Sequence, residues 1–356
     1  MAKIKLTPGQ LYFLREKDFL TKETTQYVKI GLVRDSKETE QRIKEHQTGN
    51  PRNIYDYCSL ISPFVEHLET HLHYKFGSKW ITGEWFDMSI TEMDEAIHVA
   101  KQLIAEQNEI KDDLEKSYEL ANVASNGEII CASQLAEELW GDLISLKVEM
   151  DRNATLIDII RSQIGLILGT SGSIDGVAKH IIRRGTDSFD KNTFAAENPG
   201  IYEQYATIKI SPVSGSFTLK GKKSLKDTEP ELYLKKKGLP KLEIKVDLID
   251  EDALVPRTGE LEELHKEYIE LQKNKHNYSW DYLRLEARLK ILVGNSEGID
   301  GLCGWKREPK SKIEFDAALF RQNYPELYKQ YLKTGLDSSA LSIFNWRAYP
   351  TNTEVK

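Results

Sequence analysis

Two distant stretches of the chain repeat each other. ILGTSGSIDG at residues 167–176 matches LVGNSEGIDG at residues 292–301, and a basic stretch follows both copies. Phe-Asp pairs, a proline after Asn or Tyr, and two tyrosines then follow in the same order and at the same spacing. This shared order indicates a duplicated module that packs on itself or repeats one contact.

The pattern in each copy predicts a long charged helix, a helix that ends in glycine, a basic hairpin, a short helix and a final strand. We place the first module at residues 131–221 and the second at residues 259–349. A basic segment at residues 222–258 separates them, and an acidic helical connector at residues 91–130 precedes them.

The first 90 residues follow a different pattern. LYFLR at residues 11–15 and QYVKIGLV at 26–33 are rich in aromatic and β-branched residues, which predicts an antiparallel hairpin. The expected elements after it are a helix capped by Asp35 or Ser36 and ending near His46, a turn at 48–51, a strand at 54–61, a helix at 62–76 and a short aromatic strand at 83–86. The fold class is therefore α+β: a small domain at residues 1–90, then a mainly helical region with the two helix and hairpin modules.

Composition narrows the class of protein. The chain has 356 residues and three cysteines that lie far apart, which argues against a disulfide framework and a cysteine zinc site. We expect a cytoplasmic protein without a membrane segment, because neither a signal peptide nor a long apolar run is present. The net charge is −7, but residues 87–160 are strongly acidic and residues 161–245 are basic. A nucleic-acid contact is therefore expected on the N-terminal or central segment.

Candidate functional residues occur along the N-terminal domain in the following order. Tyr12 lies in the first expected strand, and Lys29-Ile30-Gly31 lies in the second. Arg42 and His46 are four residues apart, so they share one face of the expected helix. Glu69 follows on the next helix, and the domain closes with Gly83-Glu84-Trp85-Phe86.

In this order, with the Gly49-Asn50-Pro51 turn and Leu72-His73, these motifs resemble the phage-type branch of the GIY-YIG endonuclease superfamily over about residues 10–90. The resemblance implies a metal-dependent endonuclease that hydrolyses DNA phosphodiester bonds with Mg2+ or Mn2+. It implies Glu69 as metal ligand, Arg42 on the scissile phosphate, Tyr12 with His46 at the attacking water, and Lys29 near the leaving group, while Gly31 lets the backbone pass close to the site. Lys29 replaces the second tyrosine of the family name, and Trp85-Phe86 lies where many relatives carry an asparagine.

The modules carry further candidates. Their basic stretches predict a DNA-binding surface, with a solvated charged face as the alternative. The residues concerned are Lys179, Arg183, Arg184, Lys306, Arg307, Lys310 and Lys312. The modules also weakly resemble the C-terminal segment of phage recombination nucleases of the lambda-exonuclease type. Glu243 and Lys245, with Asp227 or Asp247, would be the matching active site, although an exposed strand accounts for them more simply.

Two questions stay open at this level. His67 and His71, spaced by four, match a zinc pair, but no HExxH motif or cysteine supports them. The main hypothesis is a DNA endonuclease whose modules bind DNA, a protein partner or a second copy. The alternative is a catalytically inactive nucleic-acid-binding or protein-interaction adaptor of a phage or bacterial defence system.

Overall fold

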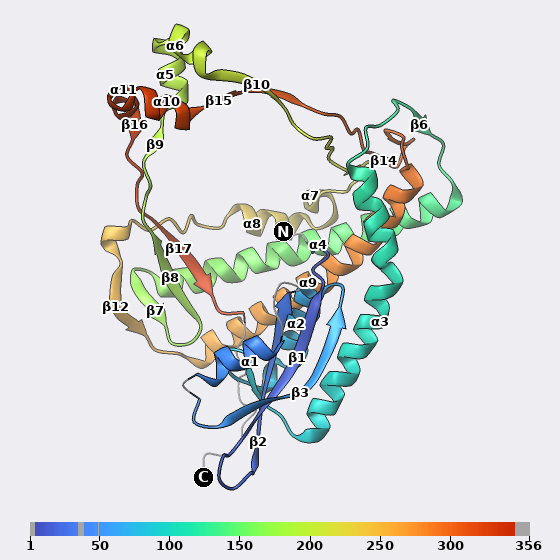
Figure 1. The fold of residues 1–356 in the computed structure, drawn as a ribbon, viewed down its shortest axis with the longest axis vertical. Coiled ribbons are helices and arrows are strands. Elements are labelled where there is room, and N and C mark those ends of the chain that lie inside the picture. The colour runs from blue at the N-terminus through green and yellow to red at the C-terminus, as the bar shows by residue number, and fades with distance from the viewer. Residues whose placement is uncertain (1–3, 35–38, 49, 346–356) are drawn as a thin grey trace.

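The computed structural model describes residues 4–34, 39–48 and 50–345 (Figure 1). It is a mixed α+β structure, as predicted, with an antiparallel sheet at the N-terminus followed by a mainly helical region. No helix within these ranges combines the length and apolarity that crossing a bilayer requires.

The N-terminal elements match the predicted order of strands and helices. They are β1 (Gly9–Lys17), β2 (Thr24–Arg34), α1 (Thr39–Gln47), β3 (Asn53–Ser62), α2 (Val65–Lys75), the short turn η1 (Gly77–Lys79), β4 (Trp80–Thr82) and β5 (Trp85–Asp87). The proposed helix caps Asp35 and Ser36, and Gly49 of the turn, lie outside the described residues.

These strands form one sheet in the order β3-β1-β2-β5-β4. The predicted hairpin is confirmed: β1 and β2 pair antiparallel, with Phe13 opposite Ile30. Because side chains alternate across a strand, Phe13 and Ile30 face one side and Tyr12 faces the other. The first side packs against α2 and α3 (Ile90–Ala121), and the Tyr12 side packs near Ile43 of α1.

The acidic connector contains the 32-residue helix α3, which packs against two parts of the structure. Ser89 and Glu92 form a capping box at the start of α3, which satisfies the first free amide groups of the helix. The first half of α3 buries Met93 and Ala100 under the N-terminal sheet, and Leu114 further along packs with Trp280. This helix is therefore part of two cores as well as a connector.

The modules are each built on one long helix. After β6 (Ile129–Ile130), α4 (Gln134–Leu168) begins the first module, and α9 (Gly259–Val293) begins the second. Both helices have 35 residues and both end at a glycine with positive φ, Gly169 at 52° and Gly294 at 58°. The two helices pack along each other (Figure 1). The expected pair of helices in each module is thus a single unbroken helix.

Shorter elements complete the modules. After α4 come β7 (Ser171–Ile174), β8 (Ala178–Arg183), β9 (Ser188–Phe189), α5 (Lys191–Glu197), α6 (Pro199–Tyr205), β10 (Ala206–Ile210) and β11 (Thr218–Leu219). The inter-module segment contains α7 (Leu225–Thr228), α8 (Pro230–Lys237), η2 (Val246–Leu248) and β12 (Asp250–Val255). After α9 come β13 (Gly298–Ile299), β14 (Cys303–Gly304), β15 (Ser311–Phe315), α10 (Ala317–Asn323), α11 (Pro325–Gln330), β16 (Leu332–Lys333) and β17 (Ser338–Ile343).

The modules exchange strands. The β7-β8 hairpin of the first module is flanked by β12 and β17, which lie before and at the end of the second. The β13-β14 hairpin of the second is flanked by β6 and β11, which lie before and at the end of the first. In both sheets the strand that precedes a long helix pairs parallel and the final strand pairs antiparallel. Neither module therefore completes a sheet by itself.

The chain segments meet again at an aromatic cluster, which we call the tip, built on α5, α6, α10 and α11 (Figure 1). Phe189 stacks on Tyr328 at 4.7 Å between ring centroids, and Phe315 stacks on Tyr202 at 5.0 Å. Each stacked pair takes one ring from each module, and such aromatic pairs add stability beyond burial. Two-stranded ribbons lead to the tip, β10 with β15 and β9 with β16.

Candidate active site

The register of the hairpin places Tyr12 at the centre of the candidate site. Tyr12 lies directly opposite Gly31 and is fully buried. A methyl group added at Gly31 would lie 2.5 Å from the Tyr12 hydroxyl oxygen. The absence of a side chain at position 31 therefore makes the space that the phenol occupies. This is a structural reason for the glycine that the Lys-Ile-Gly motif contains.

Helix α1 brings two further groups to the Tyr12 hydroxyl. Tyr12 Oη lies 3.3 Å from His46 Nε2. Burial raises the pKa of Tyr12 to about 12, so the phenol keeps its proton at pH 7 and can donate it to His46 when Nε2 carries no proton. Burial, and then the charges of Lys29 and Arg42, lower the pKa of His46, so this histidine is neutral at pH 7.

Arg42 approaches the same hydroxyl, whose pKa its positive charge and hydrogen bond lower slightly against the effect of burial. Its guanidinium is also paired with Glu45, one turn along α1. The spacing of four between Arg42 and His46 thus does what the sequence predicted: both side chains come from one helix face toward Tyr12.

Lys29 lies next to this group in β2, on the same face of the sheet as Tyr12. It is only 6% exposed, and its ammonium pairs with the Glu84 carboxylate at 2.5 Å. The Glu84 carbonyl also accepts a hydrogen bond from the Ile30 amide. Glu84 is therefore anchored by its backbone while its side chain neutralises a buried cation.

Glu69 comes from α2, which runs along the part of β2 that β5 leaves uncovered. β5 pairs with β2 only from Tyr27 to Lys29, and His73 Nε2 of α2 lies 2.8 Å from the Ile30 carbonyl. Burial, followed by the nearby Glu84 charge, raises the pKa of Glu69 to about 8. Its carboxyl is thus mostly protonated at pH 7 unless a positive charge binds beside it.

A hard divalent cation would suit this pair of carboxyl groups. Mg2+ and Mn2+ prefer carboxylate oxygen, and Mg2+ usually takes only one or two carboxylates and keeps several waters. Burial first, and the Glu84 charge second, disfavour the ionised form of Glu69, and a bound cation would offset both effects. No protein cage is present: the part of the chain that the structure describes has no group of three or more His, Cys, Asp or Glu side chains arranged to hold a metal.

Glu84 is the residue to which the sequence analysis gave no role. It influences the ionisation of Tyr12, His46 and Glu69 as well as pairing with Lys29. Its position in the Gly-Glu-Trp-Phe motif was the available signal, because it is the only acidic residue between Glu69 and Phe86. Trp85 of the same motif packs against the core around Tyr12, in a structural position.

The predicted DNA-contact residues lie apart from this site and on different strands. Lys179 and Arg183 belong to β8, whereas Lys310 and Lys312 lie just before and within β15. Six of the seven are exposed: Lys179, Arg183, Arg184, Lys306, Lys310 and Lys312. Two of these are already paired, Lys306 with Glu308 and Lys312 with Glu314.

Arg307 departs from the prediction. It is 1% exposed, and its guanidinium lies 3.8 Å over the Trp305 ring. Its Nη2 donates to the carbonyl groups of Gly294 and Ser296, directly after α9. Arg307 therefore fixes the end of the long helix and cannot reach a phosphate at the surface.

The segment between the modules shows little sign of a second active site. Asp227 caps α7 through Ser224, and Glu243 and Lys245 are exposed in an irregular stretch. Lysines of this basic segment instead pair with the acidic face of α4, Lys222 with Asp151 and Lys236 with Asp158.

One histidine of the predicted zinc pair packs against the second module. The His67 ring stacks on His276 of α9 at 4.4 Å and 14°. The His71 ring lies 6.4 Å from the His67 ring and is tilted by 42° to it. Among the described residues neither histidine belongs to a group of three or more potential metal ligands, and the zinc pair stays a prediction.

Comparison with known proteins gives one match. Residues 9–101 match the family model of the T5orf172 domain, a phage-type domain. The matched range runs from β1 into the first half of α3 and contains Tyr12, Lys29, Arg42, His46 and Glu69. No curated protein and no solved structure matches the chain. The match is compatible with a nuclease-like role for the N-terminal domain.

Proposed function

We propose that the chain is a metal-dependent DNA endonuclease of the GIY-YIG type, cutting through its N-terminal domain. One observation carries the proposal: the hydroxyl of Tyr12, the imidazole of His46 and the guanidinium of Arg42 converge, and Glu69 lies near enough to shift the pKa of Tyr12. This is the constellation that the ordered motifs imply, and the phage-type domain match covers all of it.

The proton would leave the attacking water by way of Tyr12 and His46. A phenol with a pKa near 12 is a poor base by itself at pH 7. A neutral imidazole hydrogen-bonded to it can accept the phenolic proton while the phenol takes one from water. Tyr12 would thus orient the water and His46 would hold the proton.

Two cationic side chains, the half-buried Arg42 and the buried Lys29, would interact with the phosphate. Arg42 can present two parallel donors to the scissile phosphate once it leaves Glu45, and a planar guanidinium does this better than an ammonium. Lys29 would place positive charge near the leaving oxygen, with Glu84 holding it in position. Glu69 would hold Mg2+ or Mn2+, with the Glu84 charge nearby, and the cation would stabilise the charge that develops on the phosphate.

The remaining parts of the proposal concern the modules. We take residues 131–221 and 259–349 as a duplicated module that grips DNA through the exposed basic residues of β8 and β15. The matched helix lengths, matched glycine ends and reciprocal strand pairing support duplication. A protein partner or a second copy of the chain would use the same elements.

Glu69→Gln tests the proposal directly. We expect loss of Mg2+- or Mn2+-dependent nicking of supercoiled plasmid, by a factor of about 100 or more, because the change removes the anionic oxygen and keeps the size of the side chain. Glu95→Gln, at an exposed position of α3 in the same domain, is the matched control. Equal nicking by Glu69→Gln and the parent chain, with circular dichroism unchanged, would contradict the mechanism.

A DNA-binding adaptor is the second candidate. The specific observation in its favour is that Arg42 and Lys29 both already have carboxylate partners, Glu45 and Glu84. A gel-shift assay at low and high salt, run beside the nicking assay, distinguishes the two. Salt-sensitive binding without cleavage by any divalent cation would favour the adaptor.

A further inference from the structure

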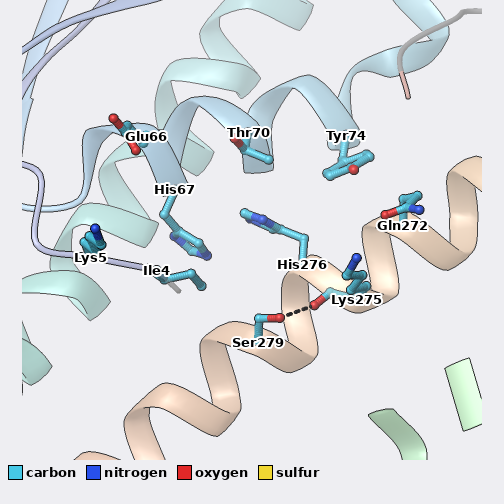
Figure 2. A pocket seen from close by; sticks show the side chains of 10 residues that line it. All are labelled: Ile4, Lys5, Glu66, His67, Thr70, Tyr74, Gln272, Lys275, His276 and Ser279. Atoms are coloured by element: carbon cyan, nitrogen blue, oxygen red, sulfur yellow. Dashed lines mark hydrogen bonds between the residues drawn. The ribbon is translucent and has the colours of Figure 1, made fainter. Parts of the chain in front are cut away.

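A separate pocket lies between α2 and α9, where the N-terminal domain meets the second module (Figure 2). Its volume is about 290 Å3. His67 and Thr70 line it from α2, and Lys275, His276 and Ser279 line it from α9. Figure 2 shows the rings of His67 and His276 facing each other across the junction of the two helices.

The hydrogen bonds around His67 fix where its proton lies. The Ser62 hydroxyl donates to Gln107 Oε1 at 2.7 Å, so the amide nitrogen of Gln107 faces His67 Nδ1 at 3.3 Å. Because that nitrogen donates, Nδ1 must accept, and the imidazole proton is on Nε2. His67 is 5% exposed, and its Nε2 is buried without a partner among the described residues. His67, which lines the pocket, therefore has a buried N–H donor that lacks an acceptor among the described residues.

The rest of the lining favours a negative ligand. His276 Nε2 is likewise buried without a partner in the described part of the chain, and its ring stacks on His67. Lys5 and Lys275 add two ammonium groups to the lining. Glu66 is the one acidic residue among the described residues that line the pocket, and Arg34 neutralises it through a 2.5 Å ion pair. An isolated water would satisfy one donor but leave this positive charge unbalanced.

We propose that this pocket binds a small phosphate anion, either free or as a compact phosphate ester, with His67 Nε2–H and the Lys275 ammonium as its principal donors. Several oxygens on one centre suit donors that converge from two helices and from the N-terminal segment. The volume is below the usual range of pockets for drug-sized ligands, which limits the ligand to a small one. Binding would tie the N-terminal domain to α9, and it does not depend on the nuclease proposal.

Isothermal titration of the full chain with inorganic phosphate tests this, with glycerol 3-phosphate as the ester and acetate at matched ionic strength as the comparison. The titration is made in an Arg42→Ala background, so that the candidate active site does not contribute. We expect saturable phosphate binding that weakens by about tenfold or more in Lys275→Gln and in His67→Phe. Phenylalanine keeps a flat ring against Trp280 and His276 and lacks both ring nitrogens.

Lys266→Gln, on the same helix but paired with Glu263 away from the pocket, is the matched control and should bind as the background does. Retained binding in Lys275→Gln would overturn the proposal even if His67→Phe failed to fold. No binding in the background chain, or equal heats for phosphate and acetate, would show a pocket filled by water only.

Discussion

At the scale of single residues, ionisation controls the candidate site. Glu69 is held near Glu84 in a buried place, and its pKa is raised from an ordinary 4.5 to about 8. Between pH 4.5 and about pH 8, the folded state therefore keeps a proton on Glu69 that the unfolded chain has released. The contribution of this proton to stability is complete below about pH 4.5 and is lost as pH rises through 8.

Glu69→Gln mimics the protonated carboxyl. The variant should therefore have the same melting temperature as the parent chain near pH 4.5 and a higher melting temperature than the parent chain at pH 8. We expect a gap of at least about 2 °C at pH 8, in the absence of divalent cations. Thermal melting followed by circular dichroism at several pH values measures it. A gap that is constant across pH would mean that Glu69 ionises normally in the folded protein.

Gly31 also matters at the scale of single residues, and its role is steric. Gly31→Ala would place a methyl group 2.5 Å from the Tyr12 hydroxyl and should destabilise the domain by about 1–3 kcal/mol. Gly77→Ala is the control, because no atom lies within 4 Å of the added carbon there. Urea unfolding compares the two variants. Equal stability would show that the Tyr12 ring can move aside without cost.

At the scale of elements, the ends of α4 and α9 decide where each module turns. Gly169 and Gly294 adopt φ values of 52° and 58°, a region that other residues enter with strain. The chain must leave both helices in this conformation to enter the hairpins β7-β8 and β13-β14.

Gly169→Ala and Gly294→Ala should each destabilise the chain by about 1–2 kcal/mol, because alanine is strained at positive φ. Gly141→Ala, inside α4 and with open space around it, should do the reverse and stabilise by about 0.5–1 kcal/mol. Denaturant melts of the three variants give the comparison. The opposite signs separate backbone strain from any general effect of adding a methyl group.

At the scale of the whole molecule, the reciprocal sheets make the modules interdependent. Each hairpin takes both of its flanking strands from outside its own module, and α4 packs along α9. The tip repeats the exchange, since the stacked pairs Phe189–Tyr328 and Phe315–Tyr202 each join the two modules. The two modules therefore form one cooperative unit, as subunits of an obligate dimer do.

Residues 131–221 or 259–349 expressed separately should therefore lack stable structure, because each would expose an unpaired hairpin and one bare helix face. Mixing the two fragments, with β6 attached to the first and residues 222–258 attached to the second, should restore helical signal in circular dichroism. A separately expressed fragment with a sharp thermal transition of its own would contradict this interdependence.

The sequence by itself determined the local features of this protein. The runs of aromatic and β-branched residues predicted the β1-β2 hairpin, helical periodicity predicted α2, and the spacing of Arg42 and His46 put them on one helix face. Each depends on neighbours a few residues apart, which is the range over which backbone geometry fixes side-chain direction. Tyr12, Lys29 and Glu69 were found only as an ordered pattern that resembles a family.

Only the tertiary structure decided the long-range matters. It buried Arg307 under Trp305, paired Lys29 with Glu84, and stacked His67 on His276 from a helix of the second module. It also exchanged the strands between modules and packed α3 into two cores. The physical reason is the same in each case. Burial and ion pairing depend on which distant segments pack together, and the residue pattern within one segment does not specify the segment that it packs against.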